Sequence, residues 1–457
     1  MPAGSGWVYE IAADENAREL AVIVRFPQGT EAALSVDDQA TRFLREVQVS
    51  QENRWATVAP VNGVWTVAEC PRGCTVRYRF FLEEAANALD DVNLATKYDG
   101  AIESPPSSWL LRPTRFDRGV HYRFHVQTAP GIAFATGVTP AEGNDTYEAD
   151  VTDLELAPYS VFGALRTRAI DTGDAHLVLA TLPGKLAMDD AAIDHWVTLA
   201  ARAVSGFYGR FPVRRALLIL VPSNGDDVSG KTLASGGASI LLDVGGAMKA
   251  TSIPADWVLT HEMIHLAFPS LARRHIWLEE GLATYVEPIA RAQAGTIPPE
   301  EVWRGLVGGL PKGEPQEGDR GLDRTPTWGR TYWGGAMFCL IADIEIRRAT
   351  QNRHSLEDAL RGIVNAGGNG EVRWSIERAL AEGDRAIGVK VLEDLHAKWG
   401  DSPVTIDLAK LWSQLGVRMK NGSIAYDDAA PDAAIRRAIA GDHAAPPQGG
   451  TQAAREQ

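Results

Sequence analysis

The segment from Trp257 to Glu287 constrains this chain more than any other, because it contains the pattern His261-Glu262-x-x-His265. Two histidines four residues apart on a helix point to the same side, so both imidazoles can reach one metal ion. This arrangement suits zinc, and a catalytic zinc takes three protein ligands and keeps a fourth position for water. An amphipathic helix with two partly buried histidines is the alternative explanation. The metal hypothesis therefore requires a third ligand nearby.

Glu280 is the candidate for that third ligand. Fourteen residues lie between His265 and Glu280, which is enough for the chain to leave one helix, turn, and return on a second helix. Pro254 and Pro269 bound the first helix, because proline is tolerated in a first turn and disfavoured inside. The second helix is expected from about residue 276 to 290. Glu279 competes with Glu280 for the same role.

Glu262 is the natural general base of such a site. Zinc lowers the pKa of a bound water to about 7, so a carboxylate beside it can take the proton and later pass it to a leaving amine. Taken alone, Glu262 could equally be a solvated helix residue. Gly281 would permit another helix to approach closely. Glu287 could orient a histidine from outside the ligand sphere, and a surface carboxylate is the alternative.

The pattern before this segment is that of a β domain, which we place at residues 1–155. Strand-like runs at Glu19–Phe26, Thr75–Leu82 and Val120–Gln127 are separated by Gly, Pro, Asn and Asp, which predicts an antiparallel β-sandwich. Cys70 and Cys74 flank a Pro-Arg-Gly turn. They could form a disulfide, which would indicate an oxidising compartment, or remain two unpaired thiols.

The periodicity changes after the β domain. Residues 156–350 should form the domain that carries the two histidines, with a helix over Asp189–Tyr208, a buried strand over Arg215–Pro222, a polar loop over Asn224–Gly230 and a strand entry at Ser235–Leu242. Residues 351–442 read as a helical C-terminal region. Residues 443–457, rich in Ala, Pro, Gly and Gln, should be disordered. The expected fold class is therefore multidomain α+β.

Composition narrows the possible partners. The chain has 457 residues, with 45 Lys and Arg against 59 Asp and Glu and a formal charge of −14, which argues against nucleic acid or an anionic membrane surface as a partner. No apolar run approaches the thickness of a bilayer, so we expect a soluble protein without an integral membrane segment. The first residues lack the charged and apolar segments of an export signal, so such a signal is absent or already removed.

Two motifs resemble a known group of enzymes. His261-Glu262-x-x-His265 followed by Glu279-Glu280-Gly281 resembles the gluzincin signature, in which the Glu before Gly is the third zinc ligand. Tyr332-Trp333-Gly334-Gly335-Ala336 is similar to the tyrosine-containing helix of the M61 peptidases, the glycyl aminopeptidase family, and more distantly of the M1 aminopeptidases. The resemblance covers mainly residues 216 to about 362.

The resemblance implies a zinc-dependent peptidase with a thermolysin-like catalytic domain. Residue by residue, it implies one Zn²⁺ ion held by His261, His265 and Glu280, Glu262 as the base, and Tyr332 donating a hydrogen bond to the oxyanion. From the residues alone, Tyr332 would be interpreted as a core or pocket-wall aromatic. Substrates should be peptides in extended form. Together with the cysteine pair, the resemblance favours an exported bacterial protein, periplasmic or extracellular.

One departure from these families concerns substrate binding. Where they carry a glycine-rich strand with a glutamate that binds a free amine, this chain has Gly236-Gly237-Ala238-Ser239 and no acid. An edge strand at Gly236, Gly237 and Ala238 could still bind an extended peptide through its backbone. The missing acid favours an endopeptidase or oligopeptidase as the alternative to an aminopeptidase. A zinc-holding scaffold or binding protein without turnover is the alternative from another class.

Overall fold

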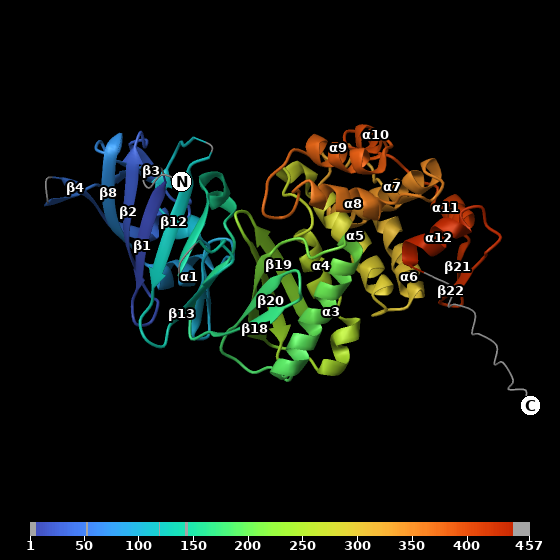
Figure 1. Cartoon of the computed structure of the whole chain (residues 1–457), viewed down its shortest axis with the longest axis horizontal. Helices are drawn as coiled ribbons and strands as arrows, with labels where there is room; N and C mark the ends of the chain where they lie inside the picture. Colours follow the sequence, from blue (N-terminus) through green and yellow to red (C-terminus); the bar gives the residue numbers. More distant parts are fainter. Residues whose placement is uncertain (1–5, 52–53, 118, 142–144, 442–457) are drawn as a thin grey trace, which may run out of the picture.

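A computed structural model describes residues 6–51, 54–117, 119–141 and 145–441. Figure 1 shows a β domain at the N-terminal end, a smaller sheet in the middle, and a group of helices towards the C-terminus. The predicted multidomain α+β class is therefore confirmed. The predicted tail, residues 443–457, lies outside the described residues. Among the described helices, none has the length and apolar content needed to cross a bilayer.

Three sheets build the N-terminal domain around one apolar core. The largest has the strand order β14-β12-β1-β2-β8-β4-β5, and the two smaller sheets have the orders β13-β15-β10-β9 and β11-β3-β7-β6. Every pair is antiparallel except β1 with β12, which run side by side in the same direction. The domain is thus a sandwich with one parallel pair, which a long connection makes possible. In chain order the strands are β1 (Trp7–Ala13), β2 (Leu20–Gln28), β3 (Ala33–Ser35), β4 (Leu44–Gln51), β5 (Arg54–Thr57), β6 (Pro60–Val61), β7 (Val64–Thr66), β8 (Arg72–Phe80), β9 (Thr96–Tyr98), β10 (Ala101–Glu103), β11 (Arg112–Pro113), β12 (His121–Gln127), β13 (Ala133–Thr136), β14 (Thr146–Asp150) and β15 (Ser160–Gly163), with helices α1 (Leu82–Leu89) and α2 (Pro106–Trp109) between them.

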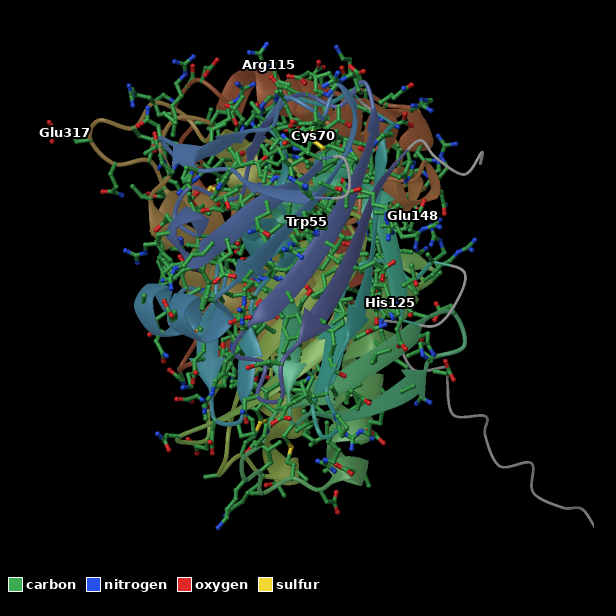
Figure 2. The ribbon with its side chains drawn as sticks, turned by 90° about the vertical axis from the view of Figure 1, so that its left-hand side faces the viewer. Trp55, Cys70, Arg115, His125, Glu148 and Glu317 are labelled. Carbon is green, nitrogen blue, oxygen red and sulfur yellow. A yellow bond between two sulfur atoms is a disulfide. The ribbon has the colours of Figure 1, made fainter. Side chains whose placement is uncertain are left out.

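The cysteines take two different states. Cys70 and Cys74 form a disulfide across the turn that leads into β8. Figure 2 shows this domain facing the viewer, with Cys70 labelled. Cys339 is a free thiol buried in the helical core, where it packs as a small apolar residue. Of the two alternatives for the turn cysteines, the structure shows the disulfide.

The middle sheet supports the site. Its order is β16-β17-β18-β20-β19, so β19 forms one edge. The strands are β16 (Arg166–Asp171), β17 (His176–Thr181), β18 (Arg215–Ser223), β19 (Val228–Ala234) and β20 (Ala238–Gly245). The predicted polar loop over Asn224–Gly230 is wrong beyond residue 227. Its last three residues begin the edge strand, in which no residue is fully buried.

Helices cover the sheet and continue to the C-terminus. Helix α3 (Asp190–Tyr208) begins at Asp189, whose side chain accepts a hydrogen bond from the backbone N–H of Ala192 and so caps the helix. The remaining helices are α4 (Val258–His265), α5 (Ile276–Gln293), α6 (Pro299–Gly309), α7 (Gly335–Ala349), α8 (Leu356–Asn365), α9 (Ile376–Ile387), α10 (Leu392–Trp399), α11 (Leu408–Leu415) and α12 (Ala433–Ala440), with a hairpin of β21 (Val417–Lys420) and β22 (Ser423–Tyr426) before the last. One apolar core extends from Ala175 to Ala440, so the C-terminal helices share it with the middle sheet.

Two glycines let α5 and α7 touch. A Cβ on Gly281 would lie 2.4 Å from the backbone of Gly335, and one on Gly335 would lie 2.1 Å from the carbonyl oxygen of Trp277. Larger residues would force the helices apart. The contact brings the residues just before α7, a π-helical turn at Gly329–Gly334 that contains Tyr332, next to the part of α5 that carries Glu280. Single π-helical turns are frequent at functional sites.

Candidate metal centre and active site

The structure brings His261, His265 and Glu280 together. The two histidines lie on α4 and the glutamate on α5, and the Nε2 atoms lie 3.4 Å (His261) and 3.5 Å (His265) from the same oxygen, Oε2 of Glu280. One nitrogen or oxygen from each of the three residues falls within 4.8 Å of the others. All three side chains are largely buried.

This donor set fits a zinc ion. In a tetrahedral site with zinc–ligand bonds of about 2.0–2.1 Å, neighbouring ligand atoms are separated by roughly 3.3 Å. The separations of 3.4 and 3.5 Å between the nitrogens and the Glu280 oxygen are close to that value. Two imidazoles and one carboxylate are also a ligand set that zinc takes in catalytic sites, where the fourth position stays open.

The electrostatics of the three ligands agree with this fit. Burial would raise the pKa of Glu280, but hydrogen bonds from His261 and His265 more than offset it and hold the pKa well below its usual range. Burial would lower the pKa of His265, but the Glu280 carboxylate raises it to about 9. Glu280 is therefore an anion at neutral pH. A metal entering the site has to displace a proton from His265, as metal binding to histidine generally does.

Glu262 is held at the edge of the site by the edge strand. The hydroxyl of Thr232 on β19 donates to Oε2 of Glu262 at 2.7 Å, and it also lies 2.9 Å from the Glu262 carbonyl oxygen. A Cβ on Gly230 would lie 2.6 Å from Cγ of Glu262, so only glycine leaves room for that side chain. Neither Gly230 nor Thr232 was predicted from the sequence. Residues two apart share a face only on a strand, and Gly230 ends the stretch that was predicted as a polar loop, so the sequence offered no signal for them.

Tyr332 lies beside the carboxylates. Burial, together with the charges of Glu280 and Glu262 and a hydrogen bond to Glu280, raises its pKa to about 12. The phenol is therefore protonated at neutral pH and can donate a hydrogen bond. Its ring lies at a tilt to Trp328, with 5.9 Å between the ring centroids.

The two other glutamates have hydrogen-bond partners outside the group of His261, His265 and Glu280. Glu279 accepts the backbone N–H of Leu271 at 3.0 Å, in the turn between α4 and α5, while its neighbour Glu280 faces the histidines. Glu287 accepts from Arg291 at 2.5 Å, and Arg291 also donates to the carbonyl of Pro254. The structure thus separates the roles of Glu279 and Glu280. It joins Glu287 to Arg291 and gives no support to its predicted role in orienting a histidine.

Gly236, Gly237 and Ala238 serve the contact between domains, which corrects their predicted role in substrate binding. Gly236 accepts the N–H of Thr139, Gly237 forms an antiparallel bridge with Val138, and the N–H of Ala238 donates to the carbonyl of Gly137. The φ angles of Gly236 and Gly237 are +69° and +151°, and a Cβ on Gly237 would lie 2.1 Å from the Gly137 carbonyl oxygen. Glycine is needed here for the backbone conformation and the close approach.

A cavity of about 630 Å³ lies over the site. All seven residues of β19, from Val228 to Ala234, line it, together with the two histidines, Glu262, Glu280 and Tyr332. Asn93 of the N-terminal domain, together with Leu156 and Tyr159, also lines the cavity. Because β19 is an edge strand, its free side can pair with an extended chain.

A second group of histidines and an acid lies near the start of α5. Asp323 accepts from His275 Nδ1 at 2.7 Å, from Trp277 Nε1 at 2.7 Å and from His396 Nε2 at 2.9 Å. The Nε of Arg274 donates to His275 Nε2, so the proton of His275 is on Nδ1 and points to Asp323. If a metal bound Nδ1 of His275, the proton would have to move to Nε2, where it would clash with the hydrogen that Arg274 donates to the same nitrogen. This group is therefore a closed hydrogen-bond network.

Comparison with solved structures identifies proteins that have a similar fold. No protein-family profile and no curated protein sequence matches the chain. Among solved structures, the chain is similar to an aminopeptidase N family protein of Idiomarina loihiensis, at 14% identity over 90% of this chain and 78% of that one, with a TM-score of 0.70. It is also similar to an M1 zinc metallopeptidase of Deinococcus radiodurans with a bound Tyr-Ser-Ala substrate, at 16% identity over 89% and 95% of the two chains, with a TM-score of 0.58.

A third similar structure is larger. Aminopeptidase A of Legionella pneumophila, in complex with aspartic acid, matches at 11% identity over 87% of this chain and 49% of that one, with a TM-score of 0.56. The three similarities show that this chain has the fold of M1 zinc metallopeptidases, with the same β domain followed by a mixed and helical part. At these identities the comparison concerns the fold alone.

Proposed function

We propose that the protein is a zinc-dependent peptidase that hydrolyses extended peptides and acts as an aminopeptidase. The observation that carries the proposal is the convergence of His261, His265 and Glu280 on one point with the separations that tetrahedral zinc requires, inside a cavity that Glu262 and Tyr332 also line. The motif around Tyr332 is the part of the sequence that favours an M61-like enzyme within this fold.

The three ligands would hold one zinc ion, which supplies a polarised water and stabilises negative charge on the scissile carbonyl. Glu262 takes the proton of the attacking water and passes it to the leaving amine. Thr232 keeps the Glu262 carboxylate in place through its hydroxyl. The phenolic hydroxyl of Tyr332 donates a hydrogen bond to the carbonyl oxygen on which negative charge develops. The free side of β19 binds the peptide backbone and sets its direction.

An endopeptidase or oligopeptidase is the second candidate, and one observation favours it. An aminopeptidase needs a negative group for the free amine of its substrate. The strand that borders the cavity, β19, carries Lys231 and no acid. A zinc-holding scaffold without turnover is the third candidate.

The deciding experiment compares wild type with Glu262→Gln. Zinc content is measured in both, and both are incubated with a mixed peptide library that is analysed by mass spectrometry. We expect one zinc per chain in both proteins and cleavage by wild type only. Cleavage confined to N-terminal residues and abolished by acetylating the substrates supports the aminopeptidase. Persistent internal cleavage supports the endopeptidase, and no cleavage by zinc-loaded wild type supports the scaffold.

The two bonded cysteines bear on the compartment of the protein. A disulfide between Cys70 and Cys74 persists in an oxidising environment. The disulfide supports an exported enzyme, periplasmic or extracellular. Mass spectrometry of the protein purified from its natural host, with free thiols alkylated beforehand, would test this.

A further inference from the structure

A second cavity opens directly beside the candidate metal centre. It has a volume of about 860 Å³ and is built mainly by α5, α6 and the segment that leads into α7. Trp257, His261 and Tyr332 line both this cavity and the one bordered by β19. A peptide whose scissile bond lies between Glu262 and Tyr332 would therefore have one flanking side chain at the mouth of this cavity.

Three tryptophans give the cavity its character. Trp257, Trp328 and Trp333 all line it, so we call it the tryptophan pocket. Trp328 is 61% exposed and Trp257 is 52% exposed, more than any other tryptophan among the described residues. Exposing two large apolar rings to water is unfavourable, and such exposure commonly marks a binding site. Both rings lie beside the site where chemistry is proposed.

The walls are fixed in place. Trp333 packs so closely on α6 that a Cβ on Gly309 would lie 1.9 Å from its ring. Behind the segment that carries Trp328, Arg330 forms a buried ion pair with Asp319 at 2.9 Å and donates to the Gly313 carbonyl. A pocket whose aromatic walls are held in this way loses little conformational entropy when a side chain enters.

Charge does not define the pocket. Its lining contains two acidic groups, Glu287 and Glu301, and two basic groups, Arg291 and Lys312. Glu287 is already paired with Arg291, and Glu301 with Arg304 on the same helix. The ammonium of Lys312 lies near the Trp328 and Trp333 rings, 6.0 and 5.7 Å from their centroids. The positive charge of Lys312 would therefore repel a cationic substrate side chain that approached these rings.

We propose that the tryptophan pocket binds a large apolar side chain, preferably an aromatic one, of the residue that flanks the scissile bond. Phenylalanine, tyrosine, tryptophan and leucine fit the apolar walls, and an aromatic ring gains edge or stacking contacts with the tryptophans. The inference rests on the proposed peptidase function, because it assigns the side-chain preference of the same site.

The chain offers a matched pair of positions for testing it. Gly305 and Gly308 both lie on α6, and a Cβ on either would have no atom within 4 Å. Gly305 lines the tryptophan pocket, whereas Gly308 is not part of the lining. Gly305→Phe therefore places a ring in the pocket, and Gly308→Phe adds the same ring to the same helix outside it.

The experiment uses tetra-alanine and its four variants with a single phenylalanine. First, kcat/KM is measured for zinc-loaded wild type, Gly305→Phe and Gly308→Phe. Second, calorimetry measures the binding of the same peptides to zinc-loaded Glu262→Gln and to the double variant that also carries Gly305→Phe. We expect one phenylalanine position to raise kcat/KM and affinity by about tenfold or more. Gly305→Phe should remove this preference and Gly308→Phe should retain it.

The outcomes separate the two proposals. Cleavage without a preference for phenylalanine at either flanking position would overturn the pocket assignment and leave the peptidase standing. A preference that persists in Gly305→Phe would also overturn it. If no peptide is cleaved, the peptidase fails. Tighter binding of one phenylalanine peptide, lost in Gly305→Phe, would still support the pocket, whereas equal affinities would remove it.

Discussion

The two histidine–carboxylate groups contain the same kinds of residue and differ in what surrounds them. In the group of His261, His265 and Glu280, both nitrogens point at one carboxylate oxygen from 3.4 and 3.5 Å, and the group borders a cavity. Around Asp323 the distances are 2.7 to 2.9 Å, and Arg274 and Trp277 supply further hydrogen bonds. One group has ligand atoms with room for an ion. The other has satisfied its polar atoms internally.

This difference teaches that residue type does not distinguish a metal site from a structural network. The direction and spacing of the donor atoms distinguish the two. A network in which each acceptor already receives a short hydrogen bond contributes to folding, because removing one member leaves buried donors without a partner. A group with wider spacing between its donor atoms leaves room for an ion. The two groups should therefore respond oppositely to substitution.

The largest expected effect is on zinc binding. His265→Ala removes one of the three proposed ligands, so we expect loss of stoichiometric zinc and, with it, loss of peptidase activity. The matched change in the other group, His396→Ala, should keep one zinc per chain. Metal analysis after dialysis against a weak chelator measures both. Zinc retained in His265→Ala, or lost in His396→Ala, would contradict the distinction between the groups.

The next effect is on stability. Asp323→Ala leaves three donors without their acceptor, and breaking such a buried group costs about 3–5 kcal/mol of unfolding free energy. The control is Asp401→Ala, because Asp401 forms an exposed pair with Arg324 nearby and such pairs contribute little to the free energy of unfolding. Urea unfolding followed by circular dichroism measures both. Equal midpoints for the two variants would show that the Asp323 network does not stabilise the fold.

A smaller effect is expected for Tyr332, which adjoins the first group and has no counterpart in the second. Tyr332→Phe removes the phenolic donor and should raise the barrier by about 2.7–4 kcal/mol, so turnover should slow by roughly a hundredfold to a thousandfold. Zinc content and the unfolding midpoint should stay at wild-type values. Unchanged turnover would exclude the hydroxyl from the mechanism, and a lower zinc content would show that it acts through the ligands.

The sequence was sufficient for the parts of the fold and site that depend on local pattern. The helix at Asp189–Tyr208 follows from periodicity, and the structure has a helix at Asp190–Tyr208. The spacing of His261 and His265 needs no tertiary information, because a helix alone puts them on one side. A second helix at the right distance along the chain made both Glu279 and Glu280 candidates, and the resemblance favoured Glu280.

The remaining parts depend on contacts between distant segments. Strand β19 begins in a stretch that reads as a polar loop, because an edge strand beside a cleft has little apolar surface to bury. The double glycine at Gly236 was assigned to substrate and instead fits the loop around Val138, about a hundred residues earlier. The Asp323 network joins residues 275, 323 and 396, which share no sequence pattern. Tyr332 was found by resemblance alone, since its place depends on the crossing of α5 and α7.

The smallest expected effect is on the pH dependence of stability. Burial would raise the pKa of Asp323, but hydrogen bonds from His275, His396 and Trp277 hold it well below the usual value of about 3.9. A carboxyl whose pKa is lower in the folded state binds fewer protons there than in the unfolded state. Its contribution to stability is therefore fully present above about pH 4 and is lost as the pH falls towards the folded-state pKa.

The test compares wild type with Asp323→Asn, which keeps the shape of the side chain and removes its charge. Unfolding free energies from urea titrations between pH 3 and 6 should fall more steeply with acid in wild type, so the two curves converge at the low end. The zinc ligands also titrate, and both proteins are therefore measured in the metal-free state, where the ligands contribute equally to each curve. Parallel curves would mean that the Asp323 carboxylate is not stabilised by its neighbours, and the contrast between a closed network and an open metal site would lose its electrostatic basis.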